Sequence, residues 1–255
     1  MKNQLLFQML LLALVPLLVQ GSNRIHGGTT AKPEKYPFIA KLLIGGQTCT
    51  GSMFNGSRYV ITAKHCFTTT DSSTGFALFN DFDRNYKEEN EKRVRIIGYK
   101  AYGEAWEDLA VAELEEKVDD VPSVKISRRT LKAGDKVRAV GYGMMGLERE
   151  SRYLRDITLT VASTEGDYIE TFVKQNNHGP CSGDSGGPLL VWEGSWVIVA
   201  TLWGGGYNCL DGTISRRYPN DIWNKLTSLP KTRQTRQIGR CGDPNWSRWA
   251  RVPCN

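Results

Sequence analysis

Between residues 36 and 205 the sequence is a succession of short β-rich runs separated by Gly-rich turns. These runs follow one another too closely for crossover helices, which is typical of antiparallel sandwiches or barrels. At 255 residues the chain can form one large all-β unit or two modest domains. The clearest runs are YPFIAKLLI (36–44), RYVIT (58–62), KRVRIIGY (92–99), KVRAVGYG (136–143), DITLTV (156–161), GPLLVW (187–192) and SWVIVATLW (195–203).

A single segment near the C-terminus has the pattern of a helix. NDIWNKLTSL (220–229) begins with Asn220, a suitable N-cap, and Pro230 ends it. The composition then becomes basic and polar, so we expect a domain boundary near residue 230.

The N-terminus has the pattern of a secretory signal peptide. Lys2 precedes an apolar run over residues 5–19, and small residues follow it. We expect a signal peptide over 1–21, with cleavage after Gly21. The alternative, a signal anchor, is less favoured because the run is shorter than the roughly 20 residues of a membrane span. The mature protein is therefore expected to be secreted into the extracellular space, with no membrane association.

Export determines how the six cysteines are interpreted. In an oxidising compartment an even number of cysteines indicates a disulfide framework. The sequence contains no CxxC pair and no His-rich cluster, so we expect no metal and no cofactor. Asn55 and Asn245 begin two sequons and are candidate glycosylation sites in a eukaryotic secretory pathway.

The positive charge is concentrated at the C-terminal end. Residues 231–255 hold six Lys or Arg against one Asp, a net charge of +5, whereas residues 25–230 carry −1. The pI near 9.0 therefore reflects this extension and does not indicate a nucleic-acid-binding protein. The extension is either a solvated arm or a small surface for anionic polymers, using its arginines with Trp246 and Trp249.

The stretch GPCSGDSGGPLL (179–190) fits neither a helix face nor an alternating strand. Its glycines and prolines require a sharply turning backbone, which would present the hydroxyl of Ser185. A serine hydroxyl is a weak nucleophile unless a base takes its proton, and that base needs an orienting group. If Ser185 is a nucleophile, the chain must also supply a histidine as its base and a carboxylate that orients this histidine.

Three histidines are candidates for the base: His26, His65 and His178. His65 is favoured because it follows the strand-like YVIT and precedes Cys66, and a disulfide at a strand end would hold the imidazole in place. Lone histidines are more often structural, so the assignment of His65 as the base for Ser185 depends on finding a carboxylate that would orient it.

Asp108 is the candidate orienting carboxylate, because it stands at the entrance of the apolar strand in EDLAVAEL (107–114). Alone it would be interpreted as a turn residue. The chain order His65, Asp108, Ser185 favours the catalytic interpretation, since it is one of the few orders known for a Ser-His-Asp triad.

TAKHC, DLAVAEL and GDSGGPL resemble the three catalytic segments of the chymotrypsin-like (trypsin-like) serine proteases. RIHGG is similar to their activation site, CTGSMFNGSRYVITAKHC to their first disulfide loop, GYG (141–143) to a mid-chain turn and LWGGGYNC to their substrate-lining strand. The resemblance covers roughly residues 24–229. It implies an all-β fold of two six-stranded antiparallel β-barrels with a C-terminal helix, a peptidase domain over 25–230 and an extension over 231–255.

The resemblance also implies the catalytic roles. Ser185 would attack the scissile carbonyl, His65 would act as base and then acid, and Asp108 would hold the imidazole. The backbone N–H groups of Gly183 and Ser185 would form the oxyanion hole.

A zymogen is implied by the same resemblance. Cleavage after Arg24 would remove a three-residue propeptide (22–24) and free the ammonium of Ile25 to pair with Asp184. His26 stands where the family usually has valine. The expected disulfides are Cys49–Cys66 and Cys181–Cys209, and the remaining Cys241 and Cys254 are paired within the extension.

Two departures from the family pattern fall beside the expected position of Asp108. Lys64 replaces the usual alanine before the histidine, and Leu202 replaces a serine whose hydroxyl normally supports the carboxylate. Either Lys64 supplies a replacement partner, or the site is decaying toward a non-catalytic binding protein. The complete triad and oxyanion loop favour an active enzyme.

Specificity is open between two alternatives. Gly179, six residues before Ser185, and Gly204, beside Trp203, resemble a pocket for large apolar or aromatic side chains. Asp211 could instead enter the pocket wall and attract Lys or Arg.

Three function classes remain. The leading one is a secreted, monomeric serine endopeptidase that acts on protein or peptide substrates and is open to protein inhibitors. The alternatives are a catalytically impaired homologue that binds partners without turnover, and a glycan-binding module that acts through the extension.

Overall fold

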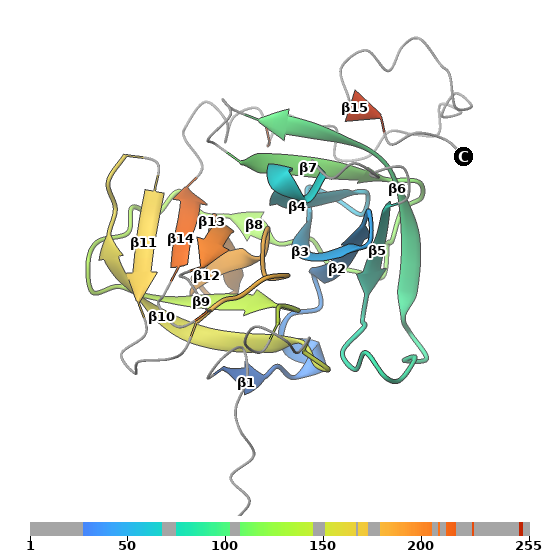
Figure 1. Cartoon of the computed structure of the whole chain (residues 1–255), viewed down its shortest axis with the longest axis horizontal. Helices are drawn as coiled ribbons and strands as arrows, with labels where there is room; N and C mark the ends of the chain where they lie inside the picture. The colour runs from blue at the N-terminus through green and yellow to red at the C-terminus, as the bar shows by residue number, and fades with distance from the viewer. Residues whose placement is uncertain are drawn as a thin grey trace, which may run out of the picture.

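The structure is a computed structural model. It describes residues 28–67, 75–102, 108–144, 151–166, 168–172, 179–205, 209, 213–217, 226 and 250–251. These residues are mostly β, and Figure 1 shows two groups of strands lying side by side. No helix in the described part of the chain is long and apolar enough to cross a membrane.

The first group of strands closes into a six-stranded antiparallel barrel. Its strands pair in the order β6-β5-β2-β3-β4-β7, and a further pairing of β6 with β7 closes the ring. We call this unit the first barrel. Its strands are β2 (Ile39–Ile44), β3 (Gln47–Phe54), β4 (Tyr59–Ala63), β5 (Gly75–Phe79), β6 (Lys92–Tyr102) and β7 (Leu109–Leu114).

The second group, which we call the second sheet, is built around six antiparallel strands in the order β10-β11-β14-β13-β12-β9. β9 also pairs with β10, which joins the two ends of this row. Two short strands attach at its sides: β1 (Thr29–Thr30) pairs with β10, and β8 (Lys125–Ile126) pairs in parallel with β13. The six main strands are β9 (Lys136–Gly141), β10 (Arg155–Ser163), β11 (Tyr168–Phe172), β12 (Pro188–Trp192), β13 (Trp196–Gly205) and β14 (Thr213–Arg217).

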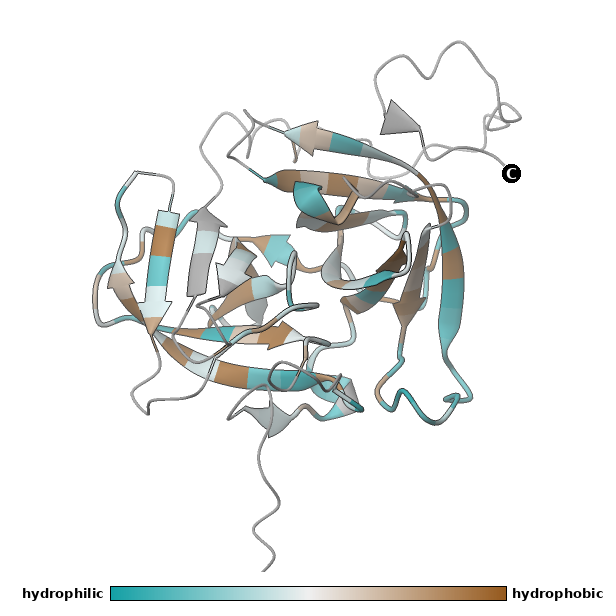
Figure 2. Ribbon diagram, in the orientation of Figure 1, coloured by the Kyte–Doolittle hydropathy of each residue, from teal (hydrophilic) through white to brown (hydrophobic). Residues whose placement is uncertain are grey.

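The two units share apolar contacts. The first barrel is filled by fully buried side chains such as Phe79 and Met53, each of which stabilises the fold by about 1.5–3 kcal/mol. The same cluster continues into the second sheet through Val140, Leu190 and Ile198, so the interface between the units is itself packed. Figure 2 shows the apolar residues gathered along the strands of both units.

All seven β-rich runs identified in the sequence contain or overlap strands of this fold. The predicted helix over 220–229 lies outside the described residues except for Leu226, which is buried. The predicted signal peptide (1–21) and propeptide (22–24) also lie outside them.

A short strand of the C-terminal extension is described. β15 (Ala250–Arg251) pairs with β6, with Ala250 opposite Tyr99 and Arg251 opposite Gly98. This pairing adds a seventh strand to the outside of the first barrel (Figure 1). Part of the extension is therefore in contact with the folded domain.

Candidate active site

The pairing of β4 with β7 brings His65 and Asp108 together. His65 lies in the short 3-10 turn η2 (Lys64–Phe67), which directly follows β4, and Asp108 directly precedes β7. Because the two strands are antiparallel neighbours, the end of one meets the start of the other. The Lys64 N–H donates to the Asp108 carbonyl at 3.0 Å and joins the two turns.

The Asp108 carboxylate contacts His65 at two points. The His65 backbone N–H donates to Oδ1 at 2.7 Å, and the imidazole Nδ1 lies 2.6 Å from Oδ2. Asp108 is buried, whereas 40% of the His65 side chain is exposed. With the Nδ1 proton directed at the carboxylate, Nε2 is the ring nitrogen that carries the lone pair, which is the tautomer that a general base requires.

Ser185 stands at the tip of a turn that requires glycine. Gly186 has φ +80°, and a Cβ there would lie 2.0 Å from Thr62 Oγ1 and 2.6 Å from the Thr50 carbonyl oxygen. The Gly186 N–H donates to the Leu202 carbonyl at 2.8 Å, which fixes this turn to β13. The glycine therefore lets the loop pass against the first barrel where any side chain would collide.

Backbone contacts place Ser185 next to the turn that carries His65. Its carbonyl accepts the Thr50 N–H at 2.9 Å and lies 3.9 Å from the sulfur of Cys66, the residue after the histidine. Within the described part of the chain, the Ser185 hydroxyl makes no hydrogen bond. The bond between a nucleophile and its base is commonly loose until a substrate binds.

Two backbone N–H groups of this loop are available to an oxyanion. The Met144 N–H donates to the Ser182 carbonyl at 2.7 Å, and the trans peptide then turns the Gly183 N–H the opposite way. Gly183 adopts φ +93°. Neither the Gly183 N–H nor the Ser185 N–H donates to a residue that the structure describes.

Asp184 is buried beneath the same loop. Its carboxylate accepts the Gly143 N–H at 2.7 Å and the Cys181 N–H at 2.8 Å. Burial raises the pKa of this carboxyl to about 6, and the two hydrogen bonds and the charge of Arg155 oppose that rise. Among the described residues, the hydrogen-bond donors to this carboxylate are neutral amides, and a cation close to it would stabilise its charged form.

Comparison with known proteins identifies the family to which this arrangement belongs. The family model described as Trypsin matches residues 25–218, which include all the site residues above. The chain belongs to the trypsin family of serine proteases.

Individual relatives are more distant. Chymotrypsin-2 of Vespa crabro is 30% identical over 189 residues, covering 66% of this chain and 83% of the relative. Human azurocidin is 27% identical over 193 residues, covering 70% of this chain and 76% of the relative. A solved mutant of human heparin binding protein superposes with a TM-score of 0.69 at 23% identity, over 78% of this chain and 93% of that one, which supports the fold.

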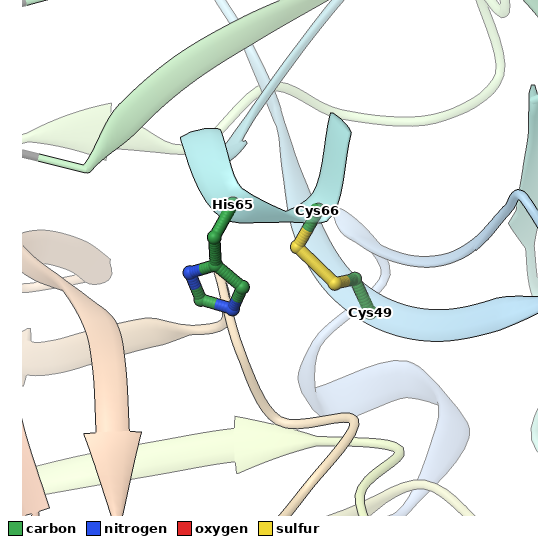
Figure 3. Close-up of side chains that lie close together, drawn as sticks. All are labelled: Cys49, His65 and Cys66. Carbon is green, nitrogen blue, oxygen red and sulfur yellow. A yellow bond between two sulfur atoms is a disulfide. The ribbon is translucent and has the colours of Figure 1, made fainter. Parts of the chain in front are cut away.

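The two disulfides expected from the trypsin family within the domain are present. Cys49–Cys66 joins β3 to η2, and Cys181–Cys209 joins the serine loop to the segment after β13. Figure 3 shows the His65 imidazole beside the first of them. The His65 nitrogen and the two sulfurs lie within 4.8 Å of one another, but the sulfurs are bonded together and offer no thiolate to a metal.

The two departures from the family pattern do not compensate each other in the structure. Leu202 is buried, and its N–H donates to the Gly187 carbonyl at 2.8 Å, so its backbone supports the serine loop while its side chain provides no hydroxyl. Among the described residues, no ion pair joins Lys64 to Asp108. Both hydrogen bonds to the carboxylate come from His65.

Residues 28–30, at the start of the described chain, are hydrogen-bonded to side chains of β10. The Arg155 guanidinium donates to the Gly28 carbonyl at 2.7 Å and to the Thr30 hydroxyl at 3.3 Å. Next to it, the Thr29 hydroxyl donates to the Asp156 carboxylate at 2.8 Å. These contacts fix the chain a few residues after the predicted activation site.

The predicted substrate pocket is described in part. Trp203 lies on β13 with 37% of its surface exposed, and its ring centroid is 6.0 Å from that of Tyr168. Gly204 follows it on the same strand, and Gly179 begins the serine loop. Tyr168 was not singled out from the sequence. The remaining predicted site residues lie outside the described part of the chain: Arg24, Ile25, Asp211, Cys241 and Cys254.

Thr50 is a further residue that the sequence did not single out. It lies on β3, within the segment that resembles the first disulfide loop but not in any catalytic segment, and it contacts the loop that carries Ser185. The signal that could have found it is its position beside Cys49, which the first disulfide ties to the turn of His65.

Proposed function

We propose that this chain is a serine endopeptidase that hydrolyses peptide bonds through an acyl-enzyme. The observation that carries the proposal is the double contact of buried Asp108 with His65, next to a glycine-dependent loop that presents Ser185. This arrangement provides a nucleophile, a base and an orienting group in the order that acyl transfer requires.

In the first step, Ser185 Oγ attacks the scissile carbonyl carbon while His65 Nε2 takes the hydroxyl proton. The oxyanion of the tetrahedral intermediate is bound by the Gly183 and Ser185 N–H groups, where one such donor is worth about 2.7–4 kcal/mol. Collapse breaks the C–N bond, and His65 delivers its proton to the leaving amine. Water then attacks the ester with His65 again as base, and the Ser185 hydroxyl is restored.

We further propose that the protein is exported as a zymogen. The support is the signal-peptide pattern over 1–21, the Arg24–Ile25 sequence and the buried Asp184 carboxylate, whose described partners are neutral amides. The ammonium of Ile25 would supply the missing positive charge after cleavage. Asn55, in the turn between β3 and β4, and Asn245, outside the described residues, are the two candidate glycosylation sites on this route.

For specificity we propose large apolar or aromatic side chains before the scissile bond. Gly179 and Gly204 place no charged side chain at these two described positions of the expected pocket, and Trp203, 37% exposed, lies on the same strand as Gly204. A peptide library decides the question. A profile dominated by Lys and Arg, and abolished by Asp211→Ala, would contradict the apolar assignment.

The decisive experiment is labelling with a peptide phosphonate, which reacts only with an activated serine. We expect a mass increase on Ser185 in the protein cleaved after Arg24 and none in Ser185→Ala. Arg24→Gln, which resists cleavage, should label slowly. Rapid labelling of intact Arg24→Gln would contradict the zymogen, and no labelling of the cleaved protein would contradict the enzyme.

A second candidate is a secreted binding protein with an impaired site. It is favoured by the apolar Leu202 in place of a hydroxyl and by the net charge of +5 over 231–255. An anionic polymer is the partner that this charge fits. Heparin, from which the similar human heparin binding protein takes its name, is a suitable probe. Salt-dependent heparin binding by an unreactive protein, lost on removal of 231–255, would support this candidate over the enzyme.

A further inference from the structure

Thr50 lies where the first barrel meets the loop of Ser185. It is on β3 and fully buried. Its main chain is fixed on both sides, because the Thr50 N–H donates to the Ser185 carbonyl at 2.9 Å and the Thr62 hydroxyl donates to the Thr50 carbonyl at 2.8 Å. The Thr50 side chain is therefore held at a defined place against the second sheet.

The Thr50 hydroxyl links two further segments. It donates to the Gly183 carbonyl at 2.8 Å and accepts the Tyr142 N–H at 3.1 Å. These partners are 133 and 92 residues away in the sequence. One buried side chain thus joins β3, the turn after β9 and the serine loop.

The hydrogen bond from the Thr50 hydroxyl to the Gly183 carbonyl affects the direction of the Gly183 N–H, which the proposed mechanism uses to bind the oxyanion. The Ser182 carbonyl, on one side of Gly183, is held by the Met144 N–H, and the Gly183 carbonyl, on the other, is held by Thr50. With both flanking peptides fixed, the Gly183 N–H has one direction. Glycine at φ +93° has wide freedom to rotate, so this restraint matters more here than at another residue.

We propose that Thr50 is a positioning residue for the oxyanion hole: its hydroxyl aligns the Gly183 N–H, and its main-chain N–H aligns Ser185 from across the interface. The inference rests on the proposed peptidase activity. A positioning role for Thr50 differs from a purely structural role in its effect on the kinetic constants. Misalignment of an amide that binds only the developing oxyanion lowers kcat and leaves substrate binding unchanged.

The test compares three variants of the cleaved protein. Thr50→Val keeps the shape of the side chain and removes the hydroxyl, and Thr50→Ser keeps the hydroxyl. Ser52→Ala is the matched control, because Ser52 is on the same strand and its buried hydroxyl has no described partner. We measure kcat, KM and the affinity for a peptide boronate, which forms a tetrahedral adduct on the serine.

We expect Thr50→Val to lower kcat by about 10- to 100-fold, somewhat less than the loss of a whole oxyanion donor, with KM within about twofold. Boronate affinity should fall by a similar factor, because the adduct places an oxygen in the same hole. Thr50→Ser should recover most of the loss, and Ser52→Ala should match the wild type. If Thr50→Val does not fold, Thr50→Ala replaces it in the same comparison.

Two results would contradict the inference in different ways. If the wild type reacts with the phosphonate and Thr50→Val retains kcat and boronate affinity, Thr50 is merely structural and the peptidase assignment stands. If the wild type itself forms no adduct at Ser185, the proposed function fails and the inference fails with it. A rise in KM without loss of kcat would also overturn the positioning role.

Discussion

His65 and Asp108 are joined through both the backbone and the ring of the histidine. The backbone N–H of His65 donates to Oδ1 at 2.7 Å, and its Nδ1 lies 2.6 Å from Oδ2. A carboxylate held in this way fixes the tautomer of the imidazole and also its rotation about the side chain. Among the described residues, both hydrogen bonds to this carboxylate come from His65.

Asp108→Asn should leave the fold intact and lower kcat by about 10⁴-fold, as amide substitution does in the triad template. The amide N–H₂ would face Nδ1 and force the proton onto Nε2, which is the wrong tautomer for a base. Steady-state kinetics on a peptide substrate measures the effect. Asp83→Asn, at a partly buried carboxylate bonded to Arg152, is the control and should retain full activity. Equal activity of both variants would contradict the role of Asp108.

Asp184 should make the stability of the uncleaved chain fall as pH rises from about 4 to 7. Burial raises the pKa of this carboxyl from 3.8 to about 6, so in that window the folded state binds more protons than the unfolded state. The contribution of Asp184 to the free energy of unfolding is fully present below pH 3.8 and is lost as pH rises through about 6. It amounts to about 3 kcal/mol. Urea unfolding at several pH values measures it. Asp184→Asn should show no such loss, and parallel curves for both proteins would refute the prediction.

Gly186→Ala should destabilise the protein by at least about 3 kcal/mol and abolish labelling of Ser185. The added Cβ would meet Thr62 Oγ1 at 2.0 Å and the Thr50 carbonyl oxygen at 2.6 Å, and the backbone cannot give way there. Gly194→Ala is the matched control, because its φ of +78° is similar and no described atom lies within 4 Å of the new Cβ. Thermal unfolding should show only the left-handed strain of about 1–2 kcal/mol in the control.

Lys64→Ala and Leu202→Ser should have additive effects on kcat/KM, within about 0.3–0.5 kcal/mol. The reason is that no ion pair joins Lys64 to Asp108 among the described residues. Leu202→Ser alone should cost about 2–5 kcal/mol of stability, because a buried apolar side chain is removed. A double-mutant cycle measures the coupling. A coupling above about 1 kcal/mol would show that Lys64 does support the carboxylate, and a large gain in the double variant over an inert parent would favour the impaired homologue.

Much of the fold could be predicted from local pattern, because strands such as β4, β6, β12 and β13 carry apolar or alternating runs between turns. Among the strands that were not predicted from the sequence, β3 and β14 were missed for identifiable reasons. β3 (QTCTGSMF) is largely polar or small and is a strand because β2 and β4 pair with both its edges. β14 (TISRR) carries two arginines and is paired between β11 and β13.

The candidate site also contains residues that could be predicted from the local sequence and residues that could not. His65 and Asp108 each stand in a short segment whose residue types point to their chemistry, so their contact could be predicted, and the catalytic role of Ser185 stays a prediction. The roles of Thr50 and Arg155 could not, since their partners are about 90–130 residues away and are selected by the packing of the two units. The compensating pair between Lys64 and Asp108, which the sequence left open, is not formed.

The strand β15 also bears on how copies of this protein behave toward each other. Within the described residues, the pairing of β5 with β6 ends at Ile96, and β15 pairs with the next positions, Gly98 and Tyr99. A chain shortened to residue 230 would leave that stretch of β6 as an open edge, and open edges pair with other chains. We therefore expect a protein shortened to residue 230 to self-associate more than the whole chain does, and size-exclusion chromatography of the two proteins would measure the difference.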